Sequence, residues 1–398
     1  MAEYDTDSSQ RKIVVLASWS ESLLNFRGQL LARLVERGHF VTACAPQRDD
    51  AVIAGLDAIG VRFETIDLHR TGMNPLHDAA TLRAINATLS RLKPDILLSY
   101  TIKPVIYGSL AANKTGVKHI CSIITGLGFA FGNETPRQKL ANFAVKRLYK
   151  RSLSSNSKVF FQNPDDLKLF LDQCLIAPEQ AVLINGSGVD LDYFRAEPLP
   201  EEPFSFLLIA RLLKEKGVME YAEAARILRE SYPDVKFRLL GPFDGNPSAI
   251  RENLIDRWQE EGLIEYLGKT DDVRPAISAS SVYVLPSYRE GTPRSVLEAM
   301  ATGRAIVTTD VAGCRETVIE GENGFLVPPR DPFGLAAAMR RFIDEPWLAM
   351  SMGLRSRVIA EQKYDVHEVN KVILENLDLN DQARGVAKPA EKISIASA

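Results

Sequence analysis

The sequence lacks most of the features that mark membrane-spanning, secreted or metal-binding chains. Its 398 residues include only four cysteines, Cys44, Cys121, Cys174 and Cys314. No two of them have the spacing of a metal knuckle or a redox motif, so we expect buried, reduced thiols. No run approaches the roughly 18 apolar residues that a membrane-spanning helix needs. The first ten residues are polar, unlike a secretory signal, and we therefore expect a cytoplasmic protein.

The sequence also lacks a large excess of charge of either sign. The net charge is −3, which excludes a dedicated nucleic-acid binder, and we expect no nucleic-acid partner. The apolar fraction of 45% and the charged fraction of 25% are those of a soluble globular protein, which excludes a mostly disordered chain. The length fits two or three domains.

Short apolar runs alternate with amphipathic stretches along most of the chain. Because the runs are continuous rather than alternating, they predict parallel strands that are covered on both faces. The expected fold class is therefore α/β, with two doubly wound domains. The expected strands are 13–17, 40–45, 61–66, 96–100, 120–124 and 159–162, then 204–210, 236–240, 264–267, 282–285, 305–308 and 324–327. Helical patterns cover 29–37, 77–92, 104–113, 136–151 and 165–172 in the first half.

A stretch rich in proline and glutamate near residue 200 separates the two series and indicates a linker. We expect an N-terminal Rossmann-like domain over 1–195 and a C-terminal one over 196–364. A helix over 365–382 is expected to pack back toward the N-terminal domain, and 383–398 to form a disordered tail. Ligands of such folds bind beyond the carboxyl ends of the strands.

The most informative stretch is 287–300, which follows the expected strand 282–285. Pro293 suits the first position of a helix with Thr292 as its N-cap, so Glu290 falls in the loop and Glu298 in the helix. A helix start binds anions, and carboxylates bind vicinal hydroxyls. A nucleotide sugar has both kinds of group. Two solvated glutamates are the alternative interpretation.

A basic cluster, 211–217, follows the expected strand 204–210. Arg211 and Lys216 can converge on one phosphate group, the first as a fork of donors and the second as a point charge. A solvated basic loop is the alternative, and the cluster alone would not decide between them.

Together the two clusters resemble the family 4 glycosyltransferases of the GT-B fold, whose C-terminal domain carries an R-x4-K pair and an E-x7-E motif. Arg211 and Lys216 match the first, and Glu290 and Glu298 the second. Segment 123–131 is most similar to a bacterial subgroup that transfers sugars, often N-acetylhexosamines, to polyprenyl-diphosphate-linked saccharides.

The resemblance implies a retaining enzyme that uses a UDP-sugar donor. It assigns the leaving diphosphate to Arg211 and Lys216, donor-sugar hydroxyls to Glu290 and ribose hydroxyls to Glu298. The further donor-binding residues that it implies are Gly291, Thr292, Pro293, Arg294 and Ser295.

The acceptor is expected on the N-terminal domain. Many family members have a Gly-Gly loop after the first strand, whereas this chain has Ala17-Ser18-Trp19-Ser20. The residues that the resemblance suggests for the acceptor or diphosphate loop are Ser18, Arg27, Thr125 and Gly126. A histidine that many members carry near Thr125 is not present at that position.

Residues 137–158 contain seven basic residues and no acidic one. They predict either a helix with a solvated basic face or a surface that meets anionic lipid, to which each basic residue contributes about 1 kcal/mol. The second interpretation would place Lys146, Arg147, Lys150 and Arg151 at the inner face of the cell membrane, where a peripheral enzyme reaches a lipid-linked acceptor.

No cofactor or metal is expected. Asp190-Leu191-Asp192 has the D-x-D pattern that holds a metal in another glycosyltransferase fold, but here a turn is favoured. Three other functions remain open. They are a family 4 hexosyltransferase with another donor or acceptor, a GT-B-like sugar-nucleotide epimerase, and an inactive sugar-nucleotide-binding scaffold.

Overall fold

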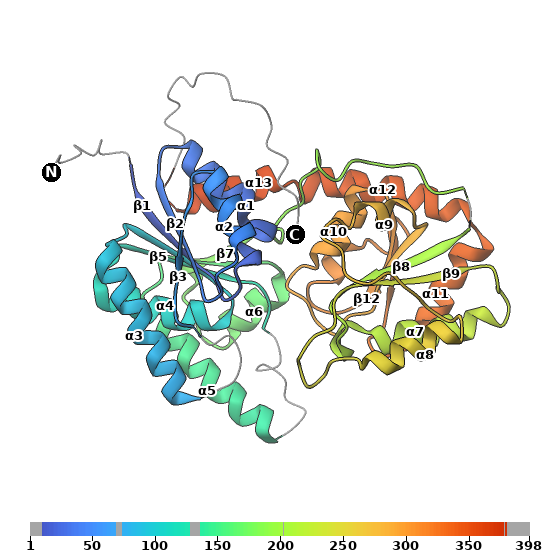
Figure 1. Ribbon diagram of the computed structural model, residues 1–398, viewed down its shortest axis with the longest axis horizontal. Coiled ribbons are helices and arrows are strands. Elements are labelled where there is room, and N and C mark those ends of the chain that lie inside the picture. Colours follow the sequence, from blue (N-terminus) through green and yellow to red (C-terminus); the bar gives the residue numbers. More distant parts are fainter. Residues whose placement is uncertain (1–9, 69–73, 128–135, 202, 378, 380–398) are drawn as a thin grey trace. The chain divides into compact units, whose positions relative to one another are not determined.

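The computed structural model describes residues 10–68, 74–127, 136–201, 203–377 and 379. The chain folds into two compact units, residues 1–184 with 370–398, and residues 185–369 (Figure 1). The expected tail, 383–398, lies outside the described residues.

The first unit contains a seven-stranded parallel sheet in the order β3-β2-β1-β4-β5-β6-β7. Because the order reverses direction at β1, the switch point of this sheet lies between β1 and β4. The strands are β1 (Lys12–Leu16), β2 (Phe40–Ala45), β3 (Arg62–Thr65), β4 (Ile96–Tyr100), β5 (His119–Ile124), β6 (Lys158–Phe161) and β7 (Ala181–Leu183).

Helices cover both faces of this sheet. Figure 1 shows α1 and α2 on one face and α3, α4 and α5 on the other. The helices are α1 (Glu21–Glu36), α2 (Asp50–Ala58), α3 (Pro75–Leu92), α4 (Ile102–Thr115), α5 (Pro136–Leu153) and α6 (Pro164–Asp172). Buried apolar residues of the strands fill the space between these layers.

The second unit contains a six-stranded parallel sheet in the order β10-β9-β8-β11-β12-β13, with its switch point between β8 and β11. The strands are β8 (Ser205–Ile209), β9 (Lys236–Leu240), β10 (Glu265–Tyr266), β11 (Val282–Leu285), β12 (Ala305–Thr309) and β13 (Gly324–Val327). Its core includes Phe206 and Phe237, whose rings stack with centroids 5.7 Å apart.

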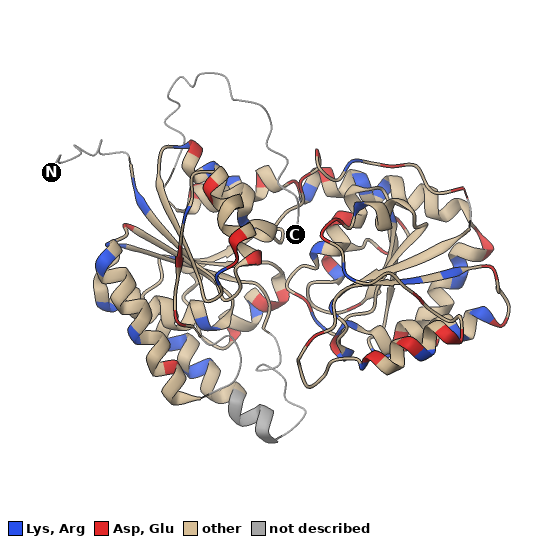
Figure 2. Ribbon diagram, in the orientation of Figure 1, with Lys and Arg blue, Asp and Glu red and all other residues tan. Residues whose placement is uncertain are grey.

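Figure 1 shows α7, α8 and α11 on one face of the second sheet and α9, α10 and α12 on the other. The helices are α7 (Val218–Arg229), α8 (Glu252–Glu260), α9 (Arg274–Ser278), α10 (Arg294–Ala301), α11 (Pro332–Asp344), α12 (Trp347–Lys363) and α13 (Val366–Asn376). Charged residues lie mainly on helices and loops, while the strands are mostly uncharged (Figure 2). No helix of the described residues is both long and apolar enough to span a bilayer.

The structure confirms the α/β class and the two doubly wound sheets, and corrects several details. The second unit begins at Asn185 rather than at 196, because Val189 pairs with Asp365 and Phe194 is buried in that unit's core. The C-terminal helix is α13, whose residues from Asn370 onward group with the first unit. The first helix starts at Glu21, well before the expected residue 29.

Two elements, α2 and β7, were not expected from the sequence. Three of the four cysteines are buried as expected, but Cys174, two residues after the end of α6, is exposed.

Candidate active site

The two sequence clusters meet at the carboxyl ends of β8 and β11, which are the neighbouring strands at the switch point of the second sheet. Arg211 follows β8, and Lys216 lies in a 3-10 helix, η3 (Lys214–Lys216). Glu290 follows β11. Strand order therefore brings together segments that lie more than 70 residues apart in sequence.

Close backbone contacts fix the two loops against each other. Gly217 has a φ of +72°, and an added Cβ there would lie 2.1 Å from the carbonyl oxygen of Pro286. Only glycine accommodates both this conformation and this approach. The glutamate loop is held on its other side by Gly313, where a Cβ would lie 2.4 Å from the carbonyl oxygen of Glu290. The Glu290 N–H donates to the carbonyl of Ala312 at 3.0 Å.

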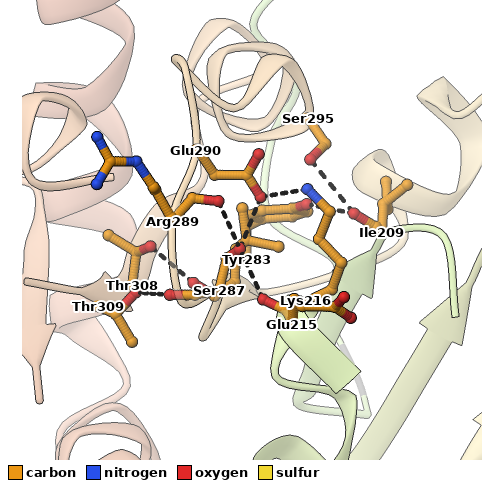
Figure 3. A network of polar contacts seen from close by, with 11 residues as sticks. Ile209, Glu215, Lys216, Tyr283, Ser287, Arg289, Glu290, Ser295, Thr308 and Thr309 are labelled. Carbon is orange, nitrogen blue, oxygen red and sulfur yellow. Dashed lines mark hydrogen bonds and ion pairs between the residues drawn. The ribbon is translucent and has the colours of Figure 1, made fainter. Parts of the chain in front are cut away.

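Lys216 and Glu290 form an ion pair at the centre of this arrangement. Lys216 Nζ lies 2.5 Å from Glu290 Oε1, and the two side chains are 22% and 14% exposed. The same carboxylate oxygen accepts a hydrogen bond from Ser287 Oγ at 2.7 Å (Figure 3). Ser287 is fully buried and its hydroxyl also contacts the carbonyl of Glu215. The glutamate is therefore held in one orientation by groups from both loops.

Glu298 is buried on α10 and is paired with a residue of its own helix. Arg294 Nε donates to Glu298 Oε1 at 2.7 Å, across one helical turn. Burial raises the pKa of Glu298, and the Arg294 charge and hydrogen bond oppose that rise. Arg294 thus favours the ionised carboxylate, which is the form that accepts hydrogen bonds from two hydroxyls.

The start of α10 differs in one detail from the sequence prediction. The helix α10 begins at Arg294, and Pro293 is its N-cap residue, with extended backbone, in place of Thr292. Thr292 instead lies against the turn at Gly186, where an added Cβ would be 2.9 Å from its Cβ. Ser295 Oγ donates to the carbonyl of Ile209 at 3.3 Å, which ties the helix start to the end of β8.

Arg211 meets a partner that the sequence prediction missed. Its Nη1 donates to Asp244 Oδ2 at 2.8 Å, so the two cations contact two different carboxylates in this structure. Asp244 follows β9, the neighbour of β8. Asp244 could have been suspected from the sequence because it follows an expected strand of the same sheet. Without the order of the strands, however, the sequence could not show that this strand lies next to β8. Ser287 lies in the same loop as Glu290, and its contact with that carboxylate was missed because it depends on the conformation of the loop.

The four residues that the sequence suggested for the acceptor or diphosphate loop lie at the carboxyl ends of β1 and β5 or on α1, in the first unit. Ser18 Oγ accepts a hydrogen bond from Thr101 at 2.8 Å. Arg27 is only 2% exposed and its guanidinium lies 5.4 Å from the ring centroid of Tyr100. Thr125 and Gly126 are half-buried and follow β5. All four therefore lie on elements around the switch point of the first sheet.

The basic stretch predicted over 137–158 includes most of helix α5. On α5, Arg147, Lys150 and Arg151 are exposed and Lys146 is half-buried. Phe143, on the same helix, is 60% exposed, and the Arg147 guanidinium lies 5.7 Å from its ring centroid.

The D-x-D segment forms a turn. Asp190 Oδ1 accepts the N–H groups of Asp192 and Tyr193 at 3.0 and 2.9 Å. In the parts of the chain that the structure describes, no group of three His, Cys, Asp or Glu side chains is arranged to hold a metal ion.

Comparison with known protein families identifies the family of this chain. Residues 203–345 match the model of "Glycosyl transferases group 1", and residues 26–186 match "Glycosyl transferase 4-like domain". The chain belongs to the family 4 glycosyltransferases. It is therefore a glycosyltransferase, and the matched segments contain Arg211, Lys216, Glu290 and Glu298.

Two relatives of this glycosyltransferase have names that specify lipid-linked acceptors. One is the N,N'-diacetylbacillosaminyl-diphospho-undecaprenol alpha-1,3-N-acetylgalactosaminyltransferase of Campylobacter jejuni, 26% identical over 354 residues, with 86% of this chain and 92% of the relative covered. The other is the UDP-Gal:alpha-D-GlcNAc-diphosphoundecaprenol alpha-1,3-galactosyltransferase of Escherichia coli, 27% identical over 299 residues, with 71% and 76% covered.

Solved structures show the same GT-B fold. Sucrose-phosphate synthase of Thermosynechococcus elongatus has a TM-score of 0.74 at 19% identity, with 92% of this chain and 98% of that chain covered. HepE of Anabaena, solved in complex with UDP, has a TM-score of 0.73 at 19% identity, with 92% and 99% covered.

Proposed function

We propose that this glycosyltransferase moves an N-acetylhexosamine from a UDP-sugar to a polyprenyl-diphosphate-linked saccharide, with retention of configuration. The observation that carries the proposal is the ion pair of Lys216 and Glu290 at the switch point of the second sheet. It places a cation for a phosphate beside a carboxylate for sugar hydroxyls. The two named relatives act on undecaprenol-linked saccharides, and both names specify an alpha-1,3 linkage.

In the proposed reaction, the bond between the donor's anomeric carbon and the β-phosphate oxygen breaks. The acceptor hydroxyl attacks from the same face of the sugar, and the leaving phosphate accepts its proton. UDP is the second product. Negative charge grows on the diphosphate as this bond breaks, so fixed cations at Arg211 and Lys216 stabilise the transition state more than the bound donor. This assigns to two side chains the role that a metal ion has in other transferases.

The two glutamates divide the recognition of the donor. Glu290 lies beside Lys216, so the hydroxyls it meets belong to the sugar next to the diphosphate. Glu298 is buried and Arg294 favours its ionised form, which suits a bidentate contact with ribose hydroxyls. The segment from Gly291 to Ser295 lies between the two glutamates in the sequence, and we assign it to the donor's sugar and phosphate.

The acceptor is assigned to the first unit. Ser18, Thr125 and Gly126 lie beyond strand ends of its sheet, where open α/β sheets bind ligands. Arg27 is buried beneath Tyr100, so we assign it the support of this surface rather than a direct contact with the acceptor phosphates.

A lipid-linked acceptor requires an approach to a membrane. The exposed side chains of Arg147, Lys150 and Arg151, with the exposed ring of Phe143 on the same helix, provide basic and aromatic groups for an anionic bilayer surface. We therefore propose a peripheral position on the inner face of the cell membrane.

The test is incubation of the protein with a panel of radiolabelled nucleotide sugars and polyprenyl-diphosphate saccharides. The expected result is transfer from a UDP-N-acetylhexosamine to a lipid-linked acceptor with an α linkage in the product. Transfer of galactose or another hexose alone would identify the hexosyltransferase alternative. Epimerised or hydrolysed donor without transfer would identify the epimerase, and bound donor without any product would identify the scaffold.

A further inference from the structure

One carboxylate at the site has no role in the proposed reaction. Asp244 binds Arg211, a residue that the proposed function assigns to the diphosphate. The Arg211 side chain is 43% exposed and that of Asp244 is 23% exposed, so the pair lies at the rim and not in the core. An ion pair of this kind is weak in most surface settings. Arg211 follows β8 at the switch point, so this pair lies where the ligand is proposed to bind, unlike other surface pairs.

The loop that carries Asp244 is built by side-chain contacts with the backbone. Asp244 Oδ1 accepts the N–H of Asn246 at 2.9 Å, and Asn246 Oδ1 accepts the N–H of Ser248 at 3.1 Å. Ser248 Oγ then donates to Glu215 Oε1 at 2.7 Å. These contacts fix the backbone around the aspartate through one carboxylate oxygen, and the other oxygen remains directed at Arg211.

The loop is also attached along its length to the segment that carries the two cations. The N–H of Lys214 donates to the carbonyl of Ser248 at 3.0 Å, and Leu213 pairs with Ala249 in an antiparallel bridge. The backbone of the Asp244 loop is therefore held against the segment that leads to the 3-10 helix ending at Lys216. The pair is a fixed part of the site.

We propose that Asp244 competes with the diphosphate of the nucleotide for Arg211 and thereby promotes release of the nucleoside diphosphate product. The inference depends on the proposed role of Arg211. A guanidinium binds phosphate through a fork of two parallel N–H donors, and one of these nitrogens, Nη1, is engaged by the carboxylate. When the diphosphate binds, Asp244 must share or lose this contact, and its charge repels the incoming anion. Both effects weaken the complex with UDP.

The aspartate acts through Arg211 and is a positioning residue. The test uses Asp244→Asn, because asparagine keeps an Oδ1 acceptor for the N–H of Asn246 while it removes the charge. Binding of UDP to the full-length protein is measured by titration calorimetry for wild type, D244N, R211A and the double variant. Glu265→Gln is the matched control, since it removes one acidic charge from a pair with Arg238 on β9 and β10 of the same unit.

The expected result is a dissociation constant for UDP that is about two- to five-fold lower in D244N, the range of an exposed ion pair. UDP should also become a stronger product inhibitor by the same factor. R211A should bind UDP more weakly than wild type, and D244N should give no gain in the R211A background. E265Q should bind as wild type does.

Equal or weaker binding by D244N would overturn the inference, because a carboxylate that only supports the loop cannot raise affinity when it is removed. A gain that persists in R211A, or that E265Q reproduces, would show a general effect of net charge and would also overturn it. Wild-type binding by R211A would refute the proposed role of Arg211, and the inference would fail with it. Weaker binding in R211A without a gain in D244N would refute the inference alone.

Discussion

Replacement of Lys216 by alanine tests the assignment of the leaving group most directly. The substitution removes the ammonium that lies 2.5 Å from Glu290. The glutamate keeps its hydrogen bond from Ser287 and its backbone contact with Ala312. The loop should therefore keep its geometry while it loses one positive charge, and any loss of rate reports on that charge.

The K216A substitution should have a large effect on the rate of transfer and a small effect on stability. Removal of one preorganised donor at a developing anion costs about 3–4 kcal/mol, or roughly 100- to 1,000-fold in kcat. The loss of stability should be small, because an ion pair with side chains 22% and 14% exposed contributes on the order of 1 kcal/mol. For a unit of this size that corresponds to a decrease of about 2–4 °C in the unfolding temperature.

The assay is the initial rate of transfer of labelled sugar to a polyprenyl-diphosphate saccharide, with kcat and KM determined separately. Lys214→Ala is the matched control, since Lys214 lies in the same 3-10 helix with an exposed side chain. Its kcat should stay within about two-fold of wild type. Arg211→Ala should show a loss in the same range as Lys216→Ala. Folded K216A and R211A proteins with near-normal kcat would refute the proposed stabilisation of the diphosphate.

Three further results are expected. Activity should survive EDTA, because we assign the neutralisation of the diphosphate to Arg211 and Lys216; complete loss that Mn²⁺ or Mg²⁺ restores would contradict this. Burial raises the pKa of Glu298 and Arg294 opposes the rise, so affinity for the donor should fall as the pH drops through the pKa of Glu298. R294M should shift this acidic limb of the pH profile to higher pH. An unchanged acidic limb would show that Glu298 is not the titrating group. Sedimentation of the wild type with anionic vesicles should weaken as salt rises. Replacement of four basic residues of α5 by glutamine should abolish this sedimentation and lower activity on long-chain acceptors, while activity on a short, soluble acceptor should be unchanged. These residues are Lys146, Arg147, Lys150 and Arg151, and the matched control replaces the exposed residues Arg48, Lys114, Lys118 and Lys168. Failure of the wild type to sediment would leave α5 as a solvated helix, and equal losses on both acceptors would mean that these residues support the fold or the active site.

Parts of the fold were predictable because they depend on local pattern. The apolar runs that became β4 and β11 are buried at every position, as expected for strands covered on both faces. The helix starts were less predictable. Pro293 is compatible with either the N-cap or the first helical position, and the contact of Thr292 with the turn at Gly186 was not visible in the sequence. The boundary between the units was misplaced because the pairing of Val189 with Asp365 joins residues that are distant along the chain.

The sequence by itself determined the class of the fold and predicted four residues of the candidate site. Continuous apolar strands require cover on both faces, and the spacings of Arg211 with Lys216 and of Glu290 with Glu298 are properties of single segments. Only the tertiary structure decided which side chains meet. The order of strands places the loop after β9 beside Arg211 and the loop after β11 beside Lys216, at separations of 33 and 74 residues. Those contacts depend on strand pairing and on the close approach at Gly217, which local sequence does not encode.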